Sequence, residues 1–177
     1  CSQIAKGSIF NFTFQARKGS EEGMPKNFLS LPKVERLSPA QKECRILVAE
    51  DNETSRNVLV LLLSRIGFKV REVSNGQDAV SLFREWTPSI ILMDVRMPRM
   101  NGFEATRAIR NSEGGGHIPI IILSASAMED NRIEALNSGA SGFLRKPFRE
   151  NEVLEEIRRF TGVIYEYEQA LHSKEEE

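Results

Sequence analysis

Short apolar runs alternate with helically spaced apolar residues along the chain from residue 45 onward. The runs cover residues 46–49, 90–93, 118–123 and 143–144, and residues 68–73 form a mixed segment that suits an edge strand. Between the runs, apolar side chains recur at helical spacing, as in Leu59, Leu62, Leu63 and Ile66. Runs that are apolar on both faces are typical of a parallel sheet covered by helices. The pattern therefore predicts a doubly wound α/β domain, in which five strands alternate with five helices.

The flanking segments differ from this body in pattern. Phe10, Phe12 and Phe14 alternate with Asn11 and Thr13, which is the period-2 pattern of a half-buried strand. Residues 15–43 carry scattered glycine, proline and charge, as linkers do, and acidic side chains dominate the last residues. We expect a separate segment over residues 1–14, a linker over 15–43, the folded domain over 44–162 and an acidic C-terminal tail over 163–177.

Composition narrows the classes of partner. The 24 basic and 25 acidic side chains give a net charge of −1, which argues against nucleic acid as the main partner. No apolar stretch reaches the roughly 18 residues of a membrane-spanning helix, so we expect a cytoplasmic chain without membrane contact. Two cysteines exclude a disulfide framework and suit a reducing compartment. The first residue is not Met, and we expect an excerpt from a longer protein.

Polar residues stand at the predicted ends of four strands. Glu50 and Asp51 follow the first run, Asp94 the next central one, and Ser124 and Lys146 the last two. Ligands of such sheets bind beyond the carboxyl ends of the strands, where neighbouring strands lie about 4.8 Å apart. Clustered carboxylates repel one another unless a cation joins them, and Mg²⁺ prefers carboxylate oxygens. An acidic cluster with one lysine and one hydroxyl predicts phosphoryl transfer to a carboxylate.

Each of these residues also has an ordinary structural interpretation. An acidic pair after a strand can cap a helix, as Asn52 or Thr54 can, and a single Asp at a strand end is often a turn residue. Lys146 alone would be a solvated surface lysine. Their joint placement at one edge of the sheet favours the functional interpretation over these alternatives.

Four separated motifs resemble a response regulator receiver domain. They are RILVAEDNETSR (45–56), ILMDVRMPRMNGFE (91–104), IIILSAS (120–126) and GASGFLRKPF (139–148), in the order that the family requires. The resemblance covers residues 45–160. It implies a flavodoxin-like receiver fold, a five-stranded parallel sheet with strand order 2-1-3-4-5.

The resemblance also implies roles for single residues. Asp94 would be the phosphoacceptor. Mg²⁺ would be bound directly by Asp51, Asp94 and the backbone carbonyl of Arg96, and through water by Glu50.

Three further roles concern the response to phosphorylation. Ser124 would be the switch hydroxyl and Phe143 the switch aromatic residue, and Lys146 would neutralise phosphoryl charge. The resemblance also implies a cis peptide bond between Lys146 and Pro147.

The implied partner is a phosphohistidine on a histidine kinase or a histidine phosphotransfer domain. It would dock near Thr54, Asn57 and Val58 on the first helix and near the loop after Lys146. Output would come from the face formed by the fourth helix, fifth strand and fifth helix. Homodimer formation is left open.

Residues 4–14 resemble the end of the ATP-binding domain of a histidine kinase, which implies that residues 1–14 are its remnant. The parent would then be a hybrid sensor kinase, with membrane anchoring left open. The chain has neither a His-Glu phosphoacceptor helix nor an Asp-x-Gly-x-Gly nucleotide loop. Catalysis by the chain itself therefore stays undecided.

Two alternatives belong to other functional classes. A phosphatase with an aspartyl nucleophile needs a second Asp two residues after the first, where Arg96 stands. A receiver-like interaction module without phosphorylation would not need the whole set of Glu50, Asp51, Asp94, Ser124 and Lys146.

Overall fold

The computed structural model describes residues 2–3, 7–8, 33–125 and 129–168. The chain divides into two units, residues 1–31 and 32–177. In the first unit, β1 (Ser2–Gln3) and β2 (Gly7–Ser8) pair in antiparallel fashion. The strand predicted from the alternating Phe10, Phe12 and Phe14 lies outside the described residues.

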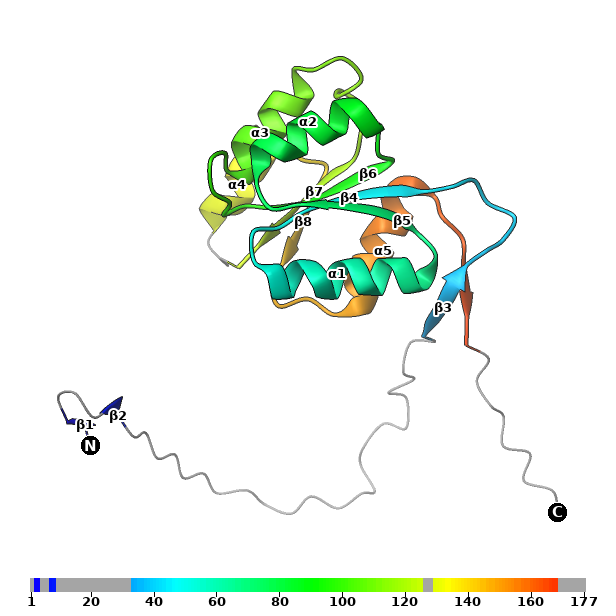
Figure 1. Ribbon diagram of the computed structural model, residues 1–177, viewed down its shortest axis with the longest axis horizontal. Helices are drawn as coiled ribbons and strands as arrows, with labels where there is room; N and C mark the ends of the chain where they lie inside the picture. Colours follow the sequence, from blue (N-terminus) through cyan, green and yellow to red (C-terminus); the bar gives the residue numbers. More distant parts are fainter. Residues whose placement is uncertain (1, 4–6, 9–32, 126–128, 169–177) are drawn as a thin grey trace. The chain divides into compact units, whose positions relative to one another are not determined.

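The second unit is built around a parallel sheet with the strand order β5-β4-β6-β7-β8 (Figure 1). Counted along the chain, these five strands have the order 2-1-3-4-5, which confirms the predicted doubly wound, flavodoxin-like fold. Its elements are β4 (Arg45–Ala49), α1 (Glu53–Ile66), β5 (Lys69–Val73), α2 (Gly76–Trp86), β6 (Ile90–Asp94), α3 (Gly102–Arg110), β7 (Ile120–Ser124), α4 (Glu129–Asn137), β8 (Gly142–Arg145) and α5 (Glu150–Thr161).

Helices cover both faces of the sheet, with α1 and α5 on one side and α2, α3 and α4 on the other (Figure 1). Every residue of β6 and β7 is buried, as their uninterrupted apolar runs predict. β5 lies at one edge and is largely exposed, which matches its mixed pattern. The carboxyl ends of β6 and β7, which carry Asp94 and Ser124, are therefore buried within the sheet.

Helix α1 begins directly after the acidic pair of the first strand. Asn52 caps it, because its Oδ1 accepts a hydrogen bond from the backbone N–H of Ser55 at 2.9 Å. Gly67 ends it with φ of 106°, a left-handed conformation that favours glycine. Glu50 and Asp51 are therefore confined to the short turn between β4 and α1.

The second unit also contains a two-stranded sheet, in which β3 (Val34–Leu37) pairs with β9 (Tyr165–Tyr167) in antiparallel fashion. We call it the terminal ribbon. Val34 and Tyr165 are buried in the core that α1 and α5 share. Neither strand was predicted, since these residues fall within the expected linker and acidic tail.

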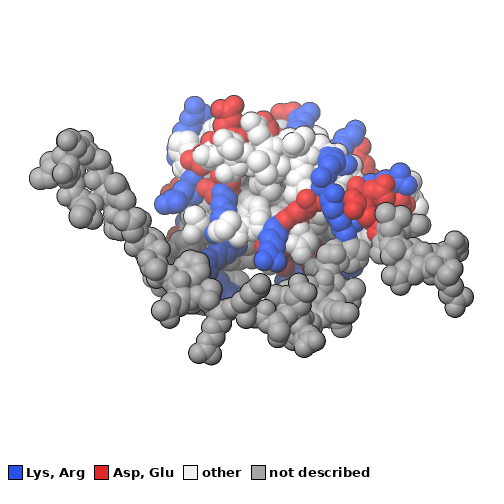
Figure 2. All heavy atoms as spheres, turned by 90° about the horizontal axis from the view of Figure 1, so that it is seen from below, with Lys and Arg blue, Asp and Glu red and all other residues white. Residues whose placement is uncertain are grey.

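Charged side chains of both signs lie next to each other over the face shown in Figure 2, so this face has no broad area of one sign among its described residues. None of the helices in the described part of the chain combines the length and hydropathy needed to cross a bilayer.

Candidate functional site

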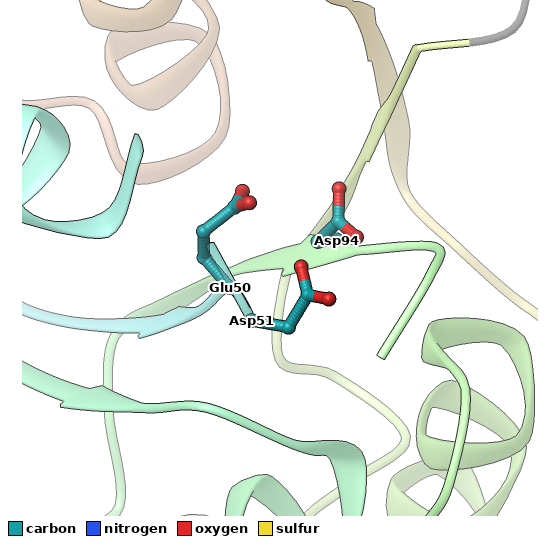
Figure 3. Close-up of side chains that lie close together, drawn as sticks. All are labelled: Glu50, Asp51 and Asp94. Carbon is teal, nitrogen blue, oxygen red and sulfur yellow. The ribbon is translucent and has the colours of Figure 1, made fainter. Parts of the chain in front are cut away.

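Three carboxylates from two neighbouring strands converge at the carboxyl edge of the sheet. Glu50 and Asp51 follow β4 and Asp94 ends β6, and Figure 3 shows the three side chains turned toward a common space. One oxygen from each lies within 4.8 Å of the other two. Glu50 and Asp94 are buried, whereas Asp51 is exposed. Oxygen donors at this spacing suit a hard divalent cation that retains water.

Lys146, in the segment after β8, reaches into the same cluster. Its Nζ contacts Glu50 and lies 2.5 Å from Oδ1 of Asp94. Burial lowers the pKa of Lys146, but the hydrogen bonds to Asp94 and Glu50 and the negative charges of these two carboxylates together raise the pKa above its ordinary value. Burial raises the pKa of Glu50 although Lys146 opposes the change. The site therefore keeps a charged ammonium group between two carboxylates.

Backbone groups fix the two sides of the cluster. The N–H of Arg96 donates to Oδ2 of Asp94 at 2.8 Å, and the N–H of Lys146 donates to the carbonyl of Ser124 at 2.7 Å. The peptide bond between Lys146 and Pro147 is cis. Both oxygens of Asp94 thus accept hydrogen bonds in a defined orientation.

The loop after Asp94 passes close to the start of α3. Gly102 donates its N–H to the carbonyl of Val95 at 2.9 Å. A Cβ atom at Gly102 would lie 2.1 Å from the carbonyl oxygen of Asp94, far inside contact distance. Only glycine fits here, so the backbone that carries Asp94 rests directly on the helix.

One open cleft is lined by all but one of the predicted site residues: Glu50, Asp51, Asp94, Arg96, Ser124 and Lys146. Phe143 is not among the described residues that line it; it lies on β8, in a separate pocket with Leu136 and Glu156. A second cavity, lined by Phe83, Thr87 and His117, has Glu113 as the single carboxylate among its described lining residues. The cleft at Asp94, where acidic side chains converge, is therefore the candidate functional site.

The family model for the response regulator receiver domain matches residues 46–158, well over half of the chain. The chain belongs to the response regulator receiver family. The matched range contains the sheet of β4 to β8 and the whole acidic cluster. The receiver domain is thus of the type used in two-component signalling.

Known relatives support this assignment. Protein PilH of Pseudomonas aeruginosa is 35% identical over 113 residues, which cover 64% of this chain and 93% of that protein. The autoinducer 2 sensor kinase/phosphatase LuxQ of Vibrio vulnificus is 34% identical over 161 residues. These residues cover 90% of this chain but 18% of LuxQ, so the receiver chain spans a small part of that relative.

A solved structure matches the fold closely. The receiver domain of a sensor histidine kinase from Pseudomonas aeruginosa PAO1 superposes with a TM-score of 0.65 at 36% identity. The match covers 68% of this chain and 99% of that one, which has a magnesium ion coordinated in its active site cleft.

One polar residue beside the acidic cluster was not predicted from the sequence. Arg56 of α1 donates from Nη1 to the backbone carbonyls of Glu50, at 2.9 Å, and Asp51, at 3.3 Å. Hydrogen bonds to backbone carbonyls leave no signal in the sequence, so this contact of Arg56 could not be predicted.

Proposed function

We propose that this receiver domain accepts a phosphoryl group on Asp94. The observation that carries the proposal is the contact of one charged lysine, Lys146, with two buried carboxylates, Glu50 and Asp94. A buried nucleophile with a cation already at its side suits phosphoryl transfer, in which positioning and charge neutralisation supply most of the catalysis.

Mg²⁺ is the cofactor that the donor set fits best. Asp51, Asp94 and the backbone carbonyl of Arg96 would bind it directly and Glu50 through water. When bound, the ion would neutralise charge on the phosphoryl oxygens. The acidic cluster and the magnesium ion of the related receiver structure support this assignment.

In the proposed reaction, an oxygen of Asp94 forms a bond to phosphorus while the bond from phosphorus to a histidine nitrogen of the donor breaks. The imidazole leaves with that electron pair. Lys146, already at Asp94, then pairs with a phosphoryl oxygen. The N–H of Arg96 keeps the carboxylate oriented during the attack.

Ser124 and Phe143 form the proposed switch. Ser124 is buried at the end of β7, next to β8, where Leu123 pairs with Leu144. A hydrogen bond from the Ser124 hydroxyl to the phosphoryl group would draw the end of β7 toward Asp94. Phe143 on β8 would then move with it and change the face of α4, β8 and α5.

The proposed donor is a phosphohistidine on a histidine kinase or a phosphotransfer domain, docked near Val58, an exposed apolar residue of α1. We further propose a hybrid sensor kinase as the parent protein, with residues 1–14 as the remnant of its ATP-binding domain and the receiver in the cytoplasm. The likeness to LuxQ over 161 residues, well beyond the receiver itself, supports such a parent.

The test is the intact mass of the chain after incubation with acetyl phosphate and Mg²⁺, beside the variant Asp94→Asn. We expect a gain of one phosphoryl group that is lost without Mg²⁺ and lost in the variant. A gain that persists in the variant would mean another nucleophile. If neither acetyl phosphate nor a phosphohistidine donor phosphorylates the wild-type chain, the domain is an interaction module that is not phosphorylated.

A further inference from the structure

Glu50 and Asp51 are neighbours in sequence, yet their side chains face the same space (Figure 3). Successive side chains of an extended strand point to opposite faces of the sheet. Glu50 still follows the strand, since its N–H donates to the carbonyl of Val73 on β5 at 3.1 Å. The chain bends at Asp51. The convergence of the two carboxylates therefore depends on this bend.

The side chain of Arg56 forms hydrogen bonds with the backbone at this bend. Its Nη1 donates to the carbonyls of both Glu50 and Asp51, at 2.9 and 3.3 Å. Consecutive carbonyls of an extended strand point in opposite directions, so one donor atom can serve both only where the chain turns. These two hydrogen bonds would be lost if the turn straightened.

The surroundings of Arg56 fix its guanidinium in place. Its side chain is 15% exposed, and its Nε lies 3.8 Å from Oε1 of Glu72 on the neighbouring strand β5. Its backbone N–H donates to the carbonyl of Asn52 at 2.9 Å, in the first turn of α1. Arg56 is thus anchored by α1 and by β5 while it binds the turn between β4 and α1.

We infer that Arg56 is a positioning residue for cation binding, which holds the bend at Asp51 and so turns the carboxylates of Glu50 and Asp51 toward Asp94. Arg56 itself does not need to touch the ion. Groups that orient metal ligands typically contribute about 10- to 100-fold to metal affinity. The inference rests on the proposed magnesium-dependent function.

The test is a titration with Mg²⁺ alone, followed by backbone amide resonances in NMR spectra of the whole chain. The variant Arg56→Met keeps most of the aliphatic stem but removes the donors. We expect its Kd for Mg²⁺ to rise about 10-fold or more. Before any Mg²⁺ is added, the amide resonances around Glu50 and Asp51 should shift, while those of α5 should not.

Arg65 provides the matched control. It lies on the same helix, is half exposed and pairs with Glu150 rather than with the acidic turn. Arg65→Met should bind Mg²⁺ within twofold of the wild type. Equal weakening in both variants would indicate general destabilisation and would overturn the role of Arg56.

The remaining outcomes separate this inference from the proposed function. If the wild type does not bind Mg²⁺, the proposed function fails. If the wild type binds it and Arg56→Met binds it within twofold, only the role of Arg56 fails. Should Arg56→Met not fold, Arg56→Lys is measured by the same criterion, because lysine keeps the charge but lacks the planar guanidinium fork.

Discussion

The Nζ atom of Lys146 lies 2.5 Å from Oδ1 of Asp94, and the same ammonium group contacts Glu50. The two carboxylates come from neighbouring strands, β4 and β6, while the lysine follows β8 at the far edge of the sheet. One cation therefore joins three separate strand ends. The positive charge of Lys146 is therefore already beside Asp94, where the proposed phosphoryl transfer would need it.

Replacing Lys146 should slow phosphorylation more than it affects binding of the donor. For Lys146→Met we expect the rate constant with acetyl phosphate to fall about 100-fold, the usual effect of removing one charge-stabilising donor. Time courses of intact mass at saturating Mg²⁺ measure it. Lys69→Met, at an exposed lysine paired with Glu43, is the control. Wild-type rates for Lys146→Met would contradict the proposed role.

The buried carboxyl group of Glu50 should make stability depend on pH. Burial raises its pKa above the ordinary 4.5, so the folded chain holds this proton to higher pH than the unfolded chain. The contribution of Glu50 to the free energy of unfolding therefore falls as pH rises above about 4.5. In the absence of divalent cations, the stability of Glu50→Gln relative to wild type should increase from pH 4.5 toward neutrality.

Urea unfolding at several pH values, with a chelator present, measures this difference. A difference that stays flat, or that decreases as pH rises, would contradict the raised pKa of Glu50.

Gly102 should tolerate no side chain. A Cβ atom there would lie 2.1 Å from the carbonyl oxygen of Asp94, so Gly102→Ala must displace the backbone that carries Asp94, the proposed phosphoacceptor. We expect a loss of about 1–3 kcal/mol in the free energy of unfolding, as overpacking usually causes, together with slower phosphorylation. Urea unfolding and intact mass measure the two effects.

Gly116 is the matched control for this substitution. A Cβ atom at Gly116 would meet nothing within 4 Å, so Gly116→Ala should change stability by less than about 0.5 kcal/mol. Similar losses in the two variants would mean that the contact with Asp94 is not the cause.

The terminal ribbon should contribute substantially to stability. Tyr165 is buried, and its hydroxyl donates to the carbonyl of Leu154 in α5 at 2.8 Å. We expect Tyr165→Phe to cost about 1 kcal/mol for the hydrogen bond and Tyr165→Ala about 3–5 kcal/mol. Ile164 is 63% exposed, and Ile164→Ala should stay within about 0.5 kcal/mol.

Urea unfolding, monitored by circular dichroism, distinguishes these variants. If Tyr165→Ala were as stable as Ile164→Ala, the ribbon would not be an integral part of the folded unit.

The five-stranded sheet could be predicted because each strand carries its own local signal. Residues 90–94 and 120–124 are uninterrupted apolar runs closed by Asp94 and Ser124, and both are buried over their full length. Parallel strands place their carboxyl ends at one edge, so the cleft that gathers Glu50, Asp94 and Lys146 followed from topology. The roles of these residues remain proposals.

The terminal ribbon lacked such a signal. Residues 34–37 are too few to establish a period, and their partners lie about 130 positions later; the ion pair of Arg36 with Glu166 is one example. The apolar residues of the ribbon, Val34 and Tyr165, are buried because they pack against core residues of α1 and α5. Long-range pairing between short segments is not encoded in either segment alone.

The ribbon also brings the entrance and the exit of the folded unit together. Glu168 donates its N–H to the carbonyl of Lys33 at 2.9 Å, and the two side chains form an ion pair at 3.1 Å. Lys33 and Glu168 lie next to the Val34–Tyr167 end of the ribbon, whereas Leu37, at its other end, lies near Gly67 at the end of α1. The acidic turn is at the opposite end of this helix, about 20 Å away. Adjacent ends permit circular permutation or insertion into a host loop. A graft joined through Lys33 and Glu168 would leave the cleft around Asp94 open.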